Sequence, residues 1–366
     1  MNKRTLAALT TTATAAALVM SACSQAPSAT PATSAKICAA TSHADAATDP
    51  AATALAGAAN KLSIAYEAAS GDGAPASLVA AGCTLIVGTD AKGNPTSLKN
   101  GSVVNVKASE AAYLAGYASA GMTTTGTLAV IGGSRDNVTS SQMDAFAEGV
   151  DAYNLAKGTS ITILGWNNGT KEGTYVDSAE QVEATTADFI AQGADIILPI
   201  AGDNNVGAAR AVTAAANPMV RLVWTGLTKD DLKGLTRDEA ASTEEVMSGQ
   251  SGAQSASPVV EQVDTQSFSD AFSYIQITDA VRSTIGAPVL TGIVLDYSTA
   301  MDTLVSEAIE GKPASTVPVS LASGGVILTG FGAYTPMLSS DLKLGLSDMA
   351  GQIETGGMVI STPFDV

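Results

Sequence analysis

The sequence predicts an α/β fold in which parallel sheets are flanked by helices. Apolar runs of strand length alternate with segments of helix length along most of the chain, which is typical of parallel sheets covered on both faces. The run ADIILPI at residues 194–200 has the length and composition of a buried strand. The helix before it ends at Gly193, a residue suited to a helix C-terminus. With 366 residues, the chain is long enough for two domains of ordinary size.

A polar turn follows this strand and is the first candidate for a ligand site. In open α/β sheets, ligands bind just beyond the carboxyl ends of the strands. Glycine in the turn lets a ligand approach the backbone, and the helix expected from residue 206 would direct its N-terminal NH groups to the same place. The candidate ligand-binding residues are Gly202, Asp203, Asn204 and Asn205. The same pattern also fits an ordinary connection between a strand and a helix.

The first 22 residues have the pattern of a secretion signal. Lys3 and Arg4 precede an apolar stretch that is too short for a comfortable membrane span, and small residues lead to Cys23. The tetrapeptide MSAC at residues 20–23 resembles the lipobox of bacterial lipoproteins, which implies that Cys23 becomes the lipidated first residue. An ordinary signal peptide with a chance cysteine is the alternative. Residues 23–35 are expected to form a flexible tether.

The charge of the chain limits its partners. The formal net charge is −17, and loss of Lys3 and Arg4 with the signal would bring it to −19. Nucleic-acid binding depends on basic patches, and anionic lipids repel an acidic surface. We therefore expect no nucleic-acid partner. We expect a covalent lipid to hold the protein on the extracytoplasmic face of the cell membrane.

Strands and helices alternate in the first part of the folded region. Asp49 is a suitable N-cap for the first helix, and Pro50 suits its first position. The expected strands are residues 36–42, 62–67, 83–89 and 101–106, and the expected helices are residues 50–59 and 75–81. The first strand ends in a polar turn with three more candidate ligand-binding residues, Ser42, His43 and Asp45. Asp45 also suits the capping of the helix that follows.

Two cysteines of this region form a candidate disulfide. Cys38 and Cys83 lie in the first and third expected strands, which are neighbours in a 2-1-3 strand order. An even number of cysteines in an exported protein favours a disulfide. Two buried thiols remain the alternative, because adjacent parallel strands suit disulfide geometry poorly.

The alternation continues to residue 226 and resumes after an insertion. The expected helices are residues 110–122, 141–153, 175–192 and 206–216, and the expected strands are residues 127–133, 160–166, 194–200 and 220–226. Residues 228–266 are polar and acidic, which is typical of a surface insertion. The remaining expected elements are a helix within 268–285, a strand at 289–295, a helix at 298–309, an apolar segment from 326 and a helix at 341–354.

Six segments together resemble a known family. They are residues 110–116 (EAAYLAG), 127–133 (TLAVIGG), 146–150 (FAEGV), 166–173 (WNNGTKEG), 193–202 (GADIILPIAG) and 324–326 (GGV). With the lipobox and the tether, their order resembles the basic membrane protein family. This family contains substrate-binding lipoproteins of ABC importers and includes bacterial purine-nucleoside receptors.

The resemblance implies a two-lobed type I periplasmic-binding-protein fold. Three crossovers would join the lobes, and the ligand would lie in the cleft between them. Residues 36–106 and 226–312 would form the first lobe, and residues 107–225 and 313–366 the second. The resemblance also implies a nucleoside or another small polar ligand, an ABC permease as partner, a monomeric chain and no cofactor.

The family pattern also suggests how the ligand is held. Trp166 follows a strand and matches a family turn, so it is the candidate for stacking on a planar ligand, with core packing as the alternative. Asn167 belongs to the same turn. Family members usually carry Asp and an aromatic residue after the first strand, and Gly-Val-Asp-x-Asp-Gln where this chain has residues 225–231. Asp45 and Asp230 are candidates for the missing carboxylates. A sugar or amino-acid receptor therefore remains an alternative to a nucleoside receptor.

An enzyme is not expected. His43 is the only histidine, and the chain has neither a G-x-S-x-G motif nor a phosphate-binding G-x-x-x-x-G-K-[ST] loop. Metal sites built from His and Cys are excluded by the small number of these residues. The stronger alternative is a structural or adhesive cell-surface lipoprotein that has this fold and has lost its small ligand.

Overall fold

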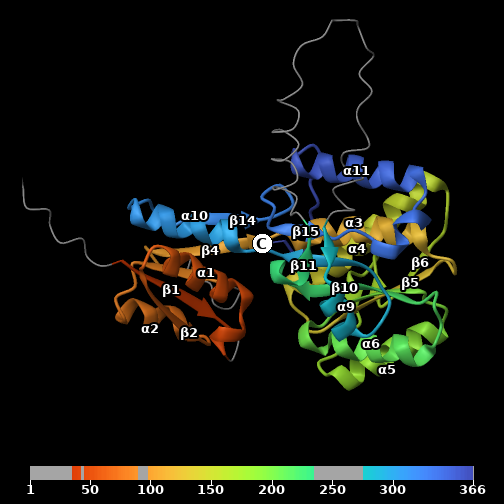
Figure 1. The fold of residues 1–366 in the computed structure, drawn as a ribbon, viewed down its shortest axis with the longest axis horizontal. Helices are drawn as coiled ribbons and strands as arrows, with labels where there is room; N and C mark the ends of the chain where they lie inside the picture. Colours follow the sequence, from red (N-terminus) through yellow and green to blue (C-terminus); the bar gives the residue numbers. More distant parts are fainter. Residues whose placement is uncertain (1–34, 43–44, 90–97, 235–274, 366) are drawn as a thin grey trace, which may run out of the picture. The chain divides into compact units, whose positions relative to one another are not determined.

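The strands of the first part assemble a five-stranded parallel sheet. The computed structural model describes residues 35–42, 45–89, 98–234 and 275–365. The strand order is β14-β4-β3-β1-β2, so the expected 2-1-3 order of the first three strands is confirmed. The strands, seen in Figure 1, are β1 (Lys36–Thr41), β2 (Ala65–Ser70), β3 (Leu85–Gly88), β4 (Gly101–Val106) and β14 (Thr316–Val319).

Helices cover both faces of this sheet because successive strand residues point to opposite sides. Ile37 and Ala39 of β1 pack with α1 (Pro50–Lys61) and α10 (Ser298–Ile309). Cys38 and Ala40 point the other way and pack with α2 (Ala74–Ala80). The expected start of α1 is confirmed, since the Asp49 side chain accepts hydrogen bonds from the first backbone NH groups of the helix and Pro50 is its first residue.

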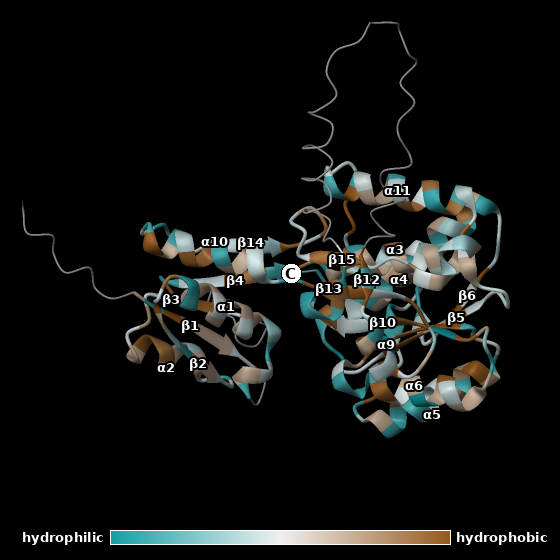
Figure 2. Ribbon diagram, viewed as in Figure 1, coloured by the Kyte–Doolittle hydropathy of each residue, from teal (hydrophilic) through white to brown (hydrophobic). Residues whose placement is uncertain are grey.

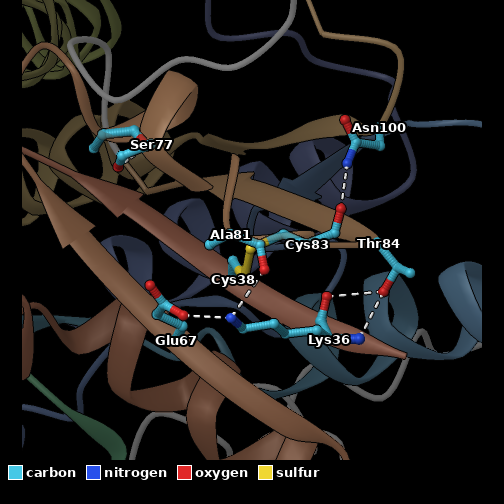
Figure 3. The surroundings of a disulfide bond; sticks show 9 residues. Lys36, Cys38, Glu67, Ser77, Ala81, Cys83, Thr84 and Asn100 are labelled. Carbon is cyan, nitrogen blue, oxygen red and sulfur yellow. Dashed lines mark hydrogen bonds and ion pairs between the residues drawn. A yellow bond between two sulfur atoms is a disulfide. The ribbon is translucent and has the colours of Figure 1, made fainter. Parts of the chain in front are cut away.

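A disulfide joins Cys38 to Cys83 across this sheet (Figure 3). Their Cα atoms are 6.0 Å apart, a usual spacing for a disulfide. Cys83 lies two residues before β3 rather than within it, so the bridge does not join two directly paired strand residues. The start of β1 is also fastened, because Lys36 pairs with Glu67 and exchanges hydrogen bonds with Thr84.

The second sheet has six strands in the order β15-β13-β10-β9-β5-β6. Five of them are parallel, and β15 pairs antiparallel with β13. The strands are β5 (Thr127–Gly132), β6 (Thr162–Leu164), β9 (Ile196–Ile200), β10 (Arg221–Leu227), β13 (Val289–Leu295) and β15 (Val326–Leu328).

Two groups of helices cover this sheet. Leu128 and Val130 of β5 belong to a core cluster with α3 (Ala108–Met122), α4 (Asn137–Lys157) and α11 (Ser340–Glu354). Ala129 and Ile131 point to the opposite side and pack with α5 (Ala179–Ala191) and α6 (Val206–Ala215). In Figure 2, hydrophobic and hydrophilic residues alternate along α11, as expected for a helix that buries one face.

Glycine allows α3 and α4 to approach each other closely. A Cβ atom on Gly116 would collide with the backbone carbonyl of Phe146, and one on Gly149 would collide with that of Tyr113. The segments EAAYLAG and FAEGV, singled out from the sequence, are thus in contact. Their glycines serve the packing of two helices.

Smaller elements complete the described chain. Two short antiparallel pairs are β7 (Trp166–Asn167) with β8 (Glu172–Gly173) and β11 (Leu232–Lys233) with β12 (Gln276–Ile277). A seven-residue helix, α9 (Asp279–Ile285), lies within the segment expected to contain one. The 3-10 turns are η1 (Ala46–Thr48), η2 (Gly202–Asn205), η3 (Lys229–Asp231) and η4 (Gly332–Met337). Across the described ranges, no helix has the length and apolarity of a membrane span.

The expected lobe boundaries assign two strands, β13 and β14, to the wrong sheets. Residues 226–312 were expected with residues 36–106, yet β13 belongs to the six-stranded sheet, between β10 and β15. The sequence VLTGIVL is apolar along its whole length and so requires cover on both faces, which a central position supplies. Residues 313–366 were expected with residues 107–225, yet β14 is an edge strand of the five-stranded sheet.

Several element boundaries also differ from expectation, and two of them lie next to the β7–β8 hairpin. The strand predicted to reach Trp166 ends at Leu164, because Gly165 has a φ of +85° and turns the chain into the β7–β8 hairpin. The helix predicted from residue 175 begins at Ala179, where the Ser178 side chain caps it. Tyr175 instead bridges to Gly132 at the end of β5.

Candidate functional site

Loops gather at one edge of the six-stranded sheet. Because β5, β9, β10 and β13 are parallel, their carboxyl ends lie at the same edge. We call the loops that leave them, residues 133–136, 201–205, 228–231 and 296–298, the carboxyl edge of this sheet. The first two loops are in contact, since the Gly133 NH donates to the Ile200 carbonyl.

Asn205 holds the turn after β9 in place. Its side chain is only 1% exposed. Its Oδ1 accepts from the Ala201 NH at 2.8 Å, and its Nδ2 donates to the hydroxyl and the carbonyl of Thr225 at 3.0 and 3.3 Å. The Thr225 hydroxyl in turn donates to the Pro199 carbonyl at 2.8 Å. Asn205, predicted as a ligand-binding residue, therefore connects the end of β9 to β10 and has its side-chain groups occupied.

The other predicted residues of this turn face outward. Gly202 and Asp203 are exposed, and Gly202 has a φ of +58°, which a residue without Cβ adopts easily. Asn204 is partly exposed, and its Nδ2 donates to the Asp177 carbonyl at 3.2 Å. The turn thus combines one buried anchoring residue with three accessible ones.

Trp166 is part of the core. Its indole is 7% exposed, packs edge-on against Phe364 with 5.8 Å between ring centroids, and donates through Nε1 to Asp144 at 3.1 Å. Asp144 is fully buried and also pairs with Lys171, whose Nζ lies 2.5 Å from the same oxygen. This is the core-packing arrangement that the sequence left open. The ring surface available to a ligand is small.

The β7–β8 turn carries the neighbouring predicted residue. Asn167 is exposed, and its Oδ1 accepts from the NH groups of Gly169 and Thr170, so it shapes the turn. Glu148 faces Lys171 from α4 at 3.8 Å. Burial and the charge of Asp144 raise the pKa of Glu148, and Lys171 opposes this shift.

The loop after β10 is fastened by its own acids. Asp231 accepts from the NH and hydroxyl of Thr228, which forms a capping box. Lys229 pairs with Asp296 at 3.3 Å and so joins the loops after β10 and β13. Asp230, the predicted ligand carboxylate, is exposed. Burial acts to raise the pKa of Asp296, but the hydrogen bonds from Ser298 and the charge of Lys229 outweigh it, and the pKa lies below its ordinary value.

The five-stranded sheet has its polar residues at the end of β1. Ser42 and Asp45 are exposed, and Asp45 Oδ1 accepts from the Ala47 NH at 2.9 Å, so it caps η1. His43 lies outside the described residues, as does Cys23. Ser42 and Asp45 therefore present polar groups at the surface just after β1.

Asp49 is the buried carboxylate at this edge. It is 3% exposed and accepts hydrogen bonds from Thr41 at the end of β1, from Thr89 just after β3, and from the first NH groups of α1. Burial and the charge of Asp49 raise the pKa of Tyr66 to about 12 and raise that of Tyr297 as well. Sequence reasoning identified Asp49 only as a helix cap. Nothing in the Asp-Pro sequence indicates that Asp49 also connects β1 to β3.

The described residues contain no group of three or more His, Cys, Asp or Glu side chains arranged to hold a metal ion. The carboxyl edges of the two sheets are built from hydroxyl, amide and carboxylate groups. Such groups recognise polar solutes by hydrogen bonding.

Comparisons with known proteins agree with this description. Residues 86–223 match the model of the Bmp family, described as ABC transporter substrate-binding protein PnrA-like. No curated protein matches the chain.

Solved structures share the fold at low sequence identity. A solute-binding protein of an ABC transporter system from Aeropyrum pernix K1 is 14% identical, with 90% of this chain and 94% of that chain covered and a TM-score of 0.56. A corresponding protein from Conexibacter woesei is 14% identical, with 91% and 100% covered and a TM-score of 0.54. A transcriptional activator of the comK gene from Bacillus halodurans is 12% identical, with 88% and 99% covered and a TM-score of 0.53. The predicted type I periplasmic-binding-protein fold is thus confirmed.

Proposed function

The chain belongs, through residues 86–223, to the PnrA-like family of ABC transporter substrate-binding proteins, and on this premise we propose that it is the extracytoplasmic receptor that delivers a nucleoside to an ABC permease. The family consists of binding proteins rather than enzymes. The five-stranded and six-stranded sheets would form the two lobes. The ligand would be held between their carboxyl edges as the lobes close.

The turn after β9 is the observation that carries this proposal. Asn205 and Thr225 fix its backbone, while Gly202 and Asp203 remain exposed beside it. A rigid frame that presents a free carboxylate and an accessible backbone is suited to a polar ligand, because little ordering is required when the ligand binds. A carboxylate can accept two hydrogen bonds from the hydroxyls of a ribose.

The described contacts divide the predicted ligand residues into two groups. We propose that the ligand contacts come from wholly or partly exposed residues: Ser42, Asn167, Gly202, Asp203, Asn204 and Asp230. Trp166 and Asn205 are buried, and the carboxylate of Asp45 caps η1, so these three would support the loops rather than touch the ligand. His43 remains a candidate from the turn after β1.

A thermal-shift screen tests the proposal. The chain from Ser24 would be screened against ribonucleosides, free bases, sugars and amino acids, and a ligand at 100 times its Kd should add about 2.7 kcal/mol of stability. Replacing Asp203 and Asn204 together by Ala should abolish the shift. Asp188→Ala, an exposed aspartate on α5, should leave it unchanged. A response to sugars or amino acids alone would overturn the nucleoside assignment.

A second candidate function is a surface lipoprotein that no longer binds a small ligand. It is favoured by the burial of Trp166 and Asn205, the two residues with the best chemistry for a nucleobase. The same screen decides between the candidates. Silence for every ligand class would support this alternative and contradict the receptor.

Attachment to the membrane is tested separately. We propose that Cys23 carries the lipid, because residues 20–23 form the lipobox-like sequence MSAC. Cys23→Ala should move the protein from the membrane fraction to the soluble fraction. Continued fractionation with membranes would show that the anchor lies elsewhere.

A further inference from the structure

Two segments singled out from the sequence meet where the chain passes between the sheets. The chain passes from one sheet to the other after β4, after β13 and after β14. The first passage leads into α3, which carries Glu110, and the third contains Gly324 and Gly325 before β15. Neither feature is part of the proposed ligand contacts.

The segment from Val319 to Gly325 is hydrogen-bonded to both other passages. The Lys107 NH in the first passage donates to the Val319 carbonyl at 2.8 Å, which continues the pairing of β4 with β14 (Figure 1). The Asp296 NH in the second passage donates to the Gly325 carbonyl, also at 2.8 Å. Residues 320–325 therefore lie at the centre of the connection.

The shape of this central turn is fixed by its glycines and serines. Gly324 has a φ of +68°, and a Cβ atom on Gly325 would lie 2.8 Å from a methyl carbon of Val319. The Ser320 NH donates to the Ser323 hydroxyl at 2.9 Å, and the Ser323 NH donates to the Ser320 hydroxyl at 3.2 Å. The Gly-Gly-Val sequence is thus explained by backbone conformation and close packing.

Glu110 connects this turn to α3. Its side chain is 7% exposed, and Oε2 accepts from the Leu321 NH at 2.8 Å. A glutamate in the first turn of a helix usually favours the NH groups of its own helix. Here the carboxylate bonds to a backbone group 211 positions away, while the N-cap Lys107 makes no side-chain capping bond.

We infer that Glu110 is a positioning residue for closure: it holds residues 320–325 against α3, so that this turn moves with the six-stranded sheet. Lys107 is bonded to β14, and Asp296 is bonded to Gly325 and Lys229. Bending between the sheets is then confined to the junctions at Lys107–Ala108, Asp296–Tyr297 and Val319–Ser320. Closure of the lobes rests on the proposed function, whereas the bond between Glu110 and Leu321 is independent of it. Its effect is measurable without any ligand.

Hydrogen–deuterium exchange of the Leu321 amide in the chain from Ser24 tests the inference directly. Removing a hydrogen bond to a charged acceptor should reduce protection of this amide roughly tenfold or more in Glu110→Ala. Glu110→Gln keeps an acceptor oxygen and should stay within about threefold of the wild type. Glu180→Ala removes an exposed glutamate from the first turn of α5 and should change nothing. Unchanged protection in Glu110→Ala would overturn the inference.

A second measurement covers the case in which Glu110→Ala does not fold. The groups whose charges act on Glu110 are Lys107 on its own helix and Asp365 on the C-terminal segment, and burial raises its pKa. Protonation weakens an acceptor, so Leu321 protection in the wild type should fall on acidification. It should fall much less in Glu110→Gln. Identical acid dependence in the two proteins would contradict the role of Glu110.

Movement between the two sheets can be measured separately. Spin labels at Leu62 on the C-cap of α1 and Leu155 on α4, both exposed, report the distance between the two sheets. We expect a broader distance distribution in Glu110→Ala than in the wild type, with Glu110→Gln restoring the narrower one. Equal distributions in all three would show that Glu110 does not govern movement between the sheets.

Discussion

The carboxyl edges of the two sheets are held by one buried side chain each, and the two side chains differ in charge. Asp49 connects β1, β3 and α1, and Asn205 connects β9 to β10. Both follow a strand, both are almost fully buried, and both bond to threonine. The partners explain the choice of residue. Every group that faces Asp49 in these bonds is a donor, whereas Asn205 must accept from Ala201 and donate to Thr225.

The buried residues that support the site differ from the exposed residues that can bind a ligand. A buried carboxylate with four donors, or a buried amide with its groups occupied, has little capacity left for a solute. The exposed neighbours Gly202 and Asp203 face outward at the end of β9. Polar residues at a strand end are therefore sorted by burial, and their chemical type alone does not identify the ligand contacts.

The largest expected difference between the two sheets comes from the disulfide. Of the three cysteines, two form the Cys38–Cys83 bridge in the five-stranded sheet, and they are 45 positions apart in the sequence. A disulfide of this span stabilises the fold because it restricts the unfolded chain, so its removal should cost about 4 kcal/mol of stability. Cys38→Ser with Cys83→Ser should lower amide protection in β1 and β3 far more than in β5 and β9. Equal losses in both sheets would contradict an effect local to the first.

The next largest effect is expected at Asp49. Ala at this position leaves two threonine hydroxyls and two helix NH groups without their acceptor, which should cost about 3 kcal/mol. Asp49→Asn keeps one acceptor oxygen and should cost about 1 kcal/mol. Urea unfolding measures both. If Asn proved as damaging as Ala, the charge of Asp49 would matter more than its acceptor capacity.

Introducing a carboxylate at Asn205 should make the stability of the protein depend on pH. In Asn205→Asp a carboxylate faces the Thr225 carbonyl, so we expect a loss of about 2 kcal/mol at neutral pH. The folded state would favour the protonated carboxyl, which can donate, and its pKa would be raised. Stability should therefore recover as pH falls toward about 4. Asn205→Ala serves as control, since its loss should not depend on pH in this range.

The smallest expected effect is on Tyr66. Burial is the main cause of its raised pKa, and the charge of Asp49 adds to it. Asp49→Asn should lower the pKa of Tyr66 from about 12, measured by ultraviolet difference titration with Tyr66→Phe as reference. Since the folded pKa is raised, the contribution of Tyr66 to stability is fully present below about pH 10 and is lost as pH rises to about 12. An unchanged pKa would show that Asp49 carries no charge felt at Tyr66.

Local patterns predicted the elements well, and sheet membership poorly. The bounds of β4 and α10 agree with expectation, because apolar runs and terminal residues mark them. The strand β14 was missed because Pro318 lies within it, and proline is tolerated here at the edge of a sheet. Which sheet β13 joins depends on pairing partners far along the chain. No local pattern records this choice.

The place of the turn after β9 was predicted from the sequence, but the contacts of its residues were not. The turn after β9 lies at the carboxyl edge as expected. Burial of Asn205 depends on the Thr225 hydroxyl, which comes from another strand. Trp166 faces Asp144 because Gly165 turns the chain out of the sheet, which the apolar run did not reveal. Contacts between elements decide these roles.

Hydrogen–deuterium exchange with and without ribonucleosides tests the central claim most directly. The chain from Ser24 would be measured with each of the four common ribonucleosides, with lactose as a matched neutral solute. We expect a nucleoside to protect amides in residues 201–205 and in the turn after β1 together, because the ligand would touch both carboxyl edges. Protection at one edge alone, or no protection by any nucleoside, would contradict a nucleoside receptor that closes around its ligand.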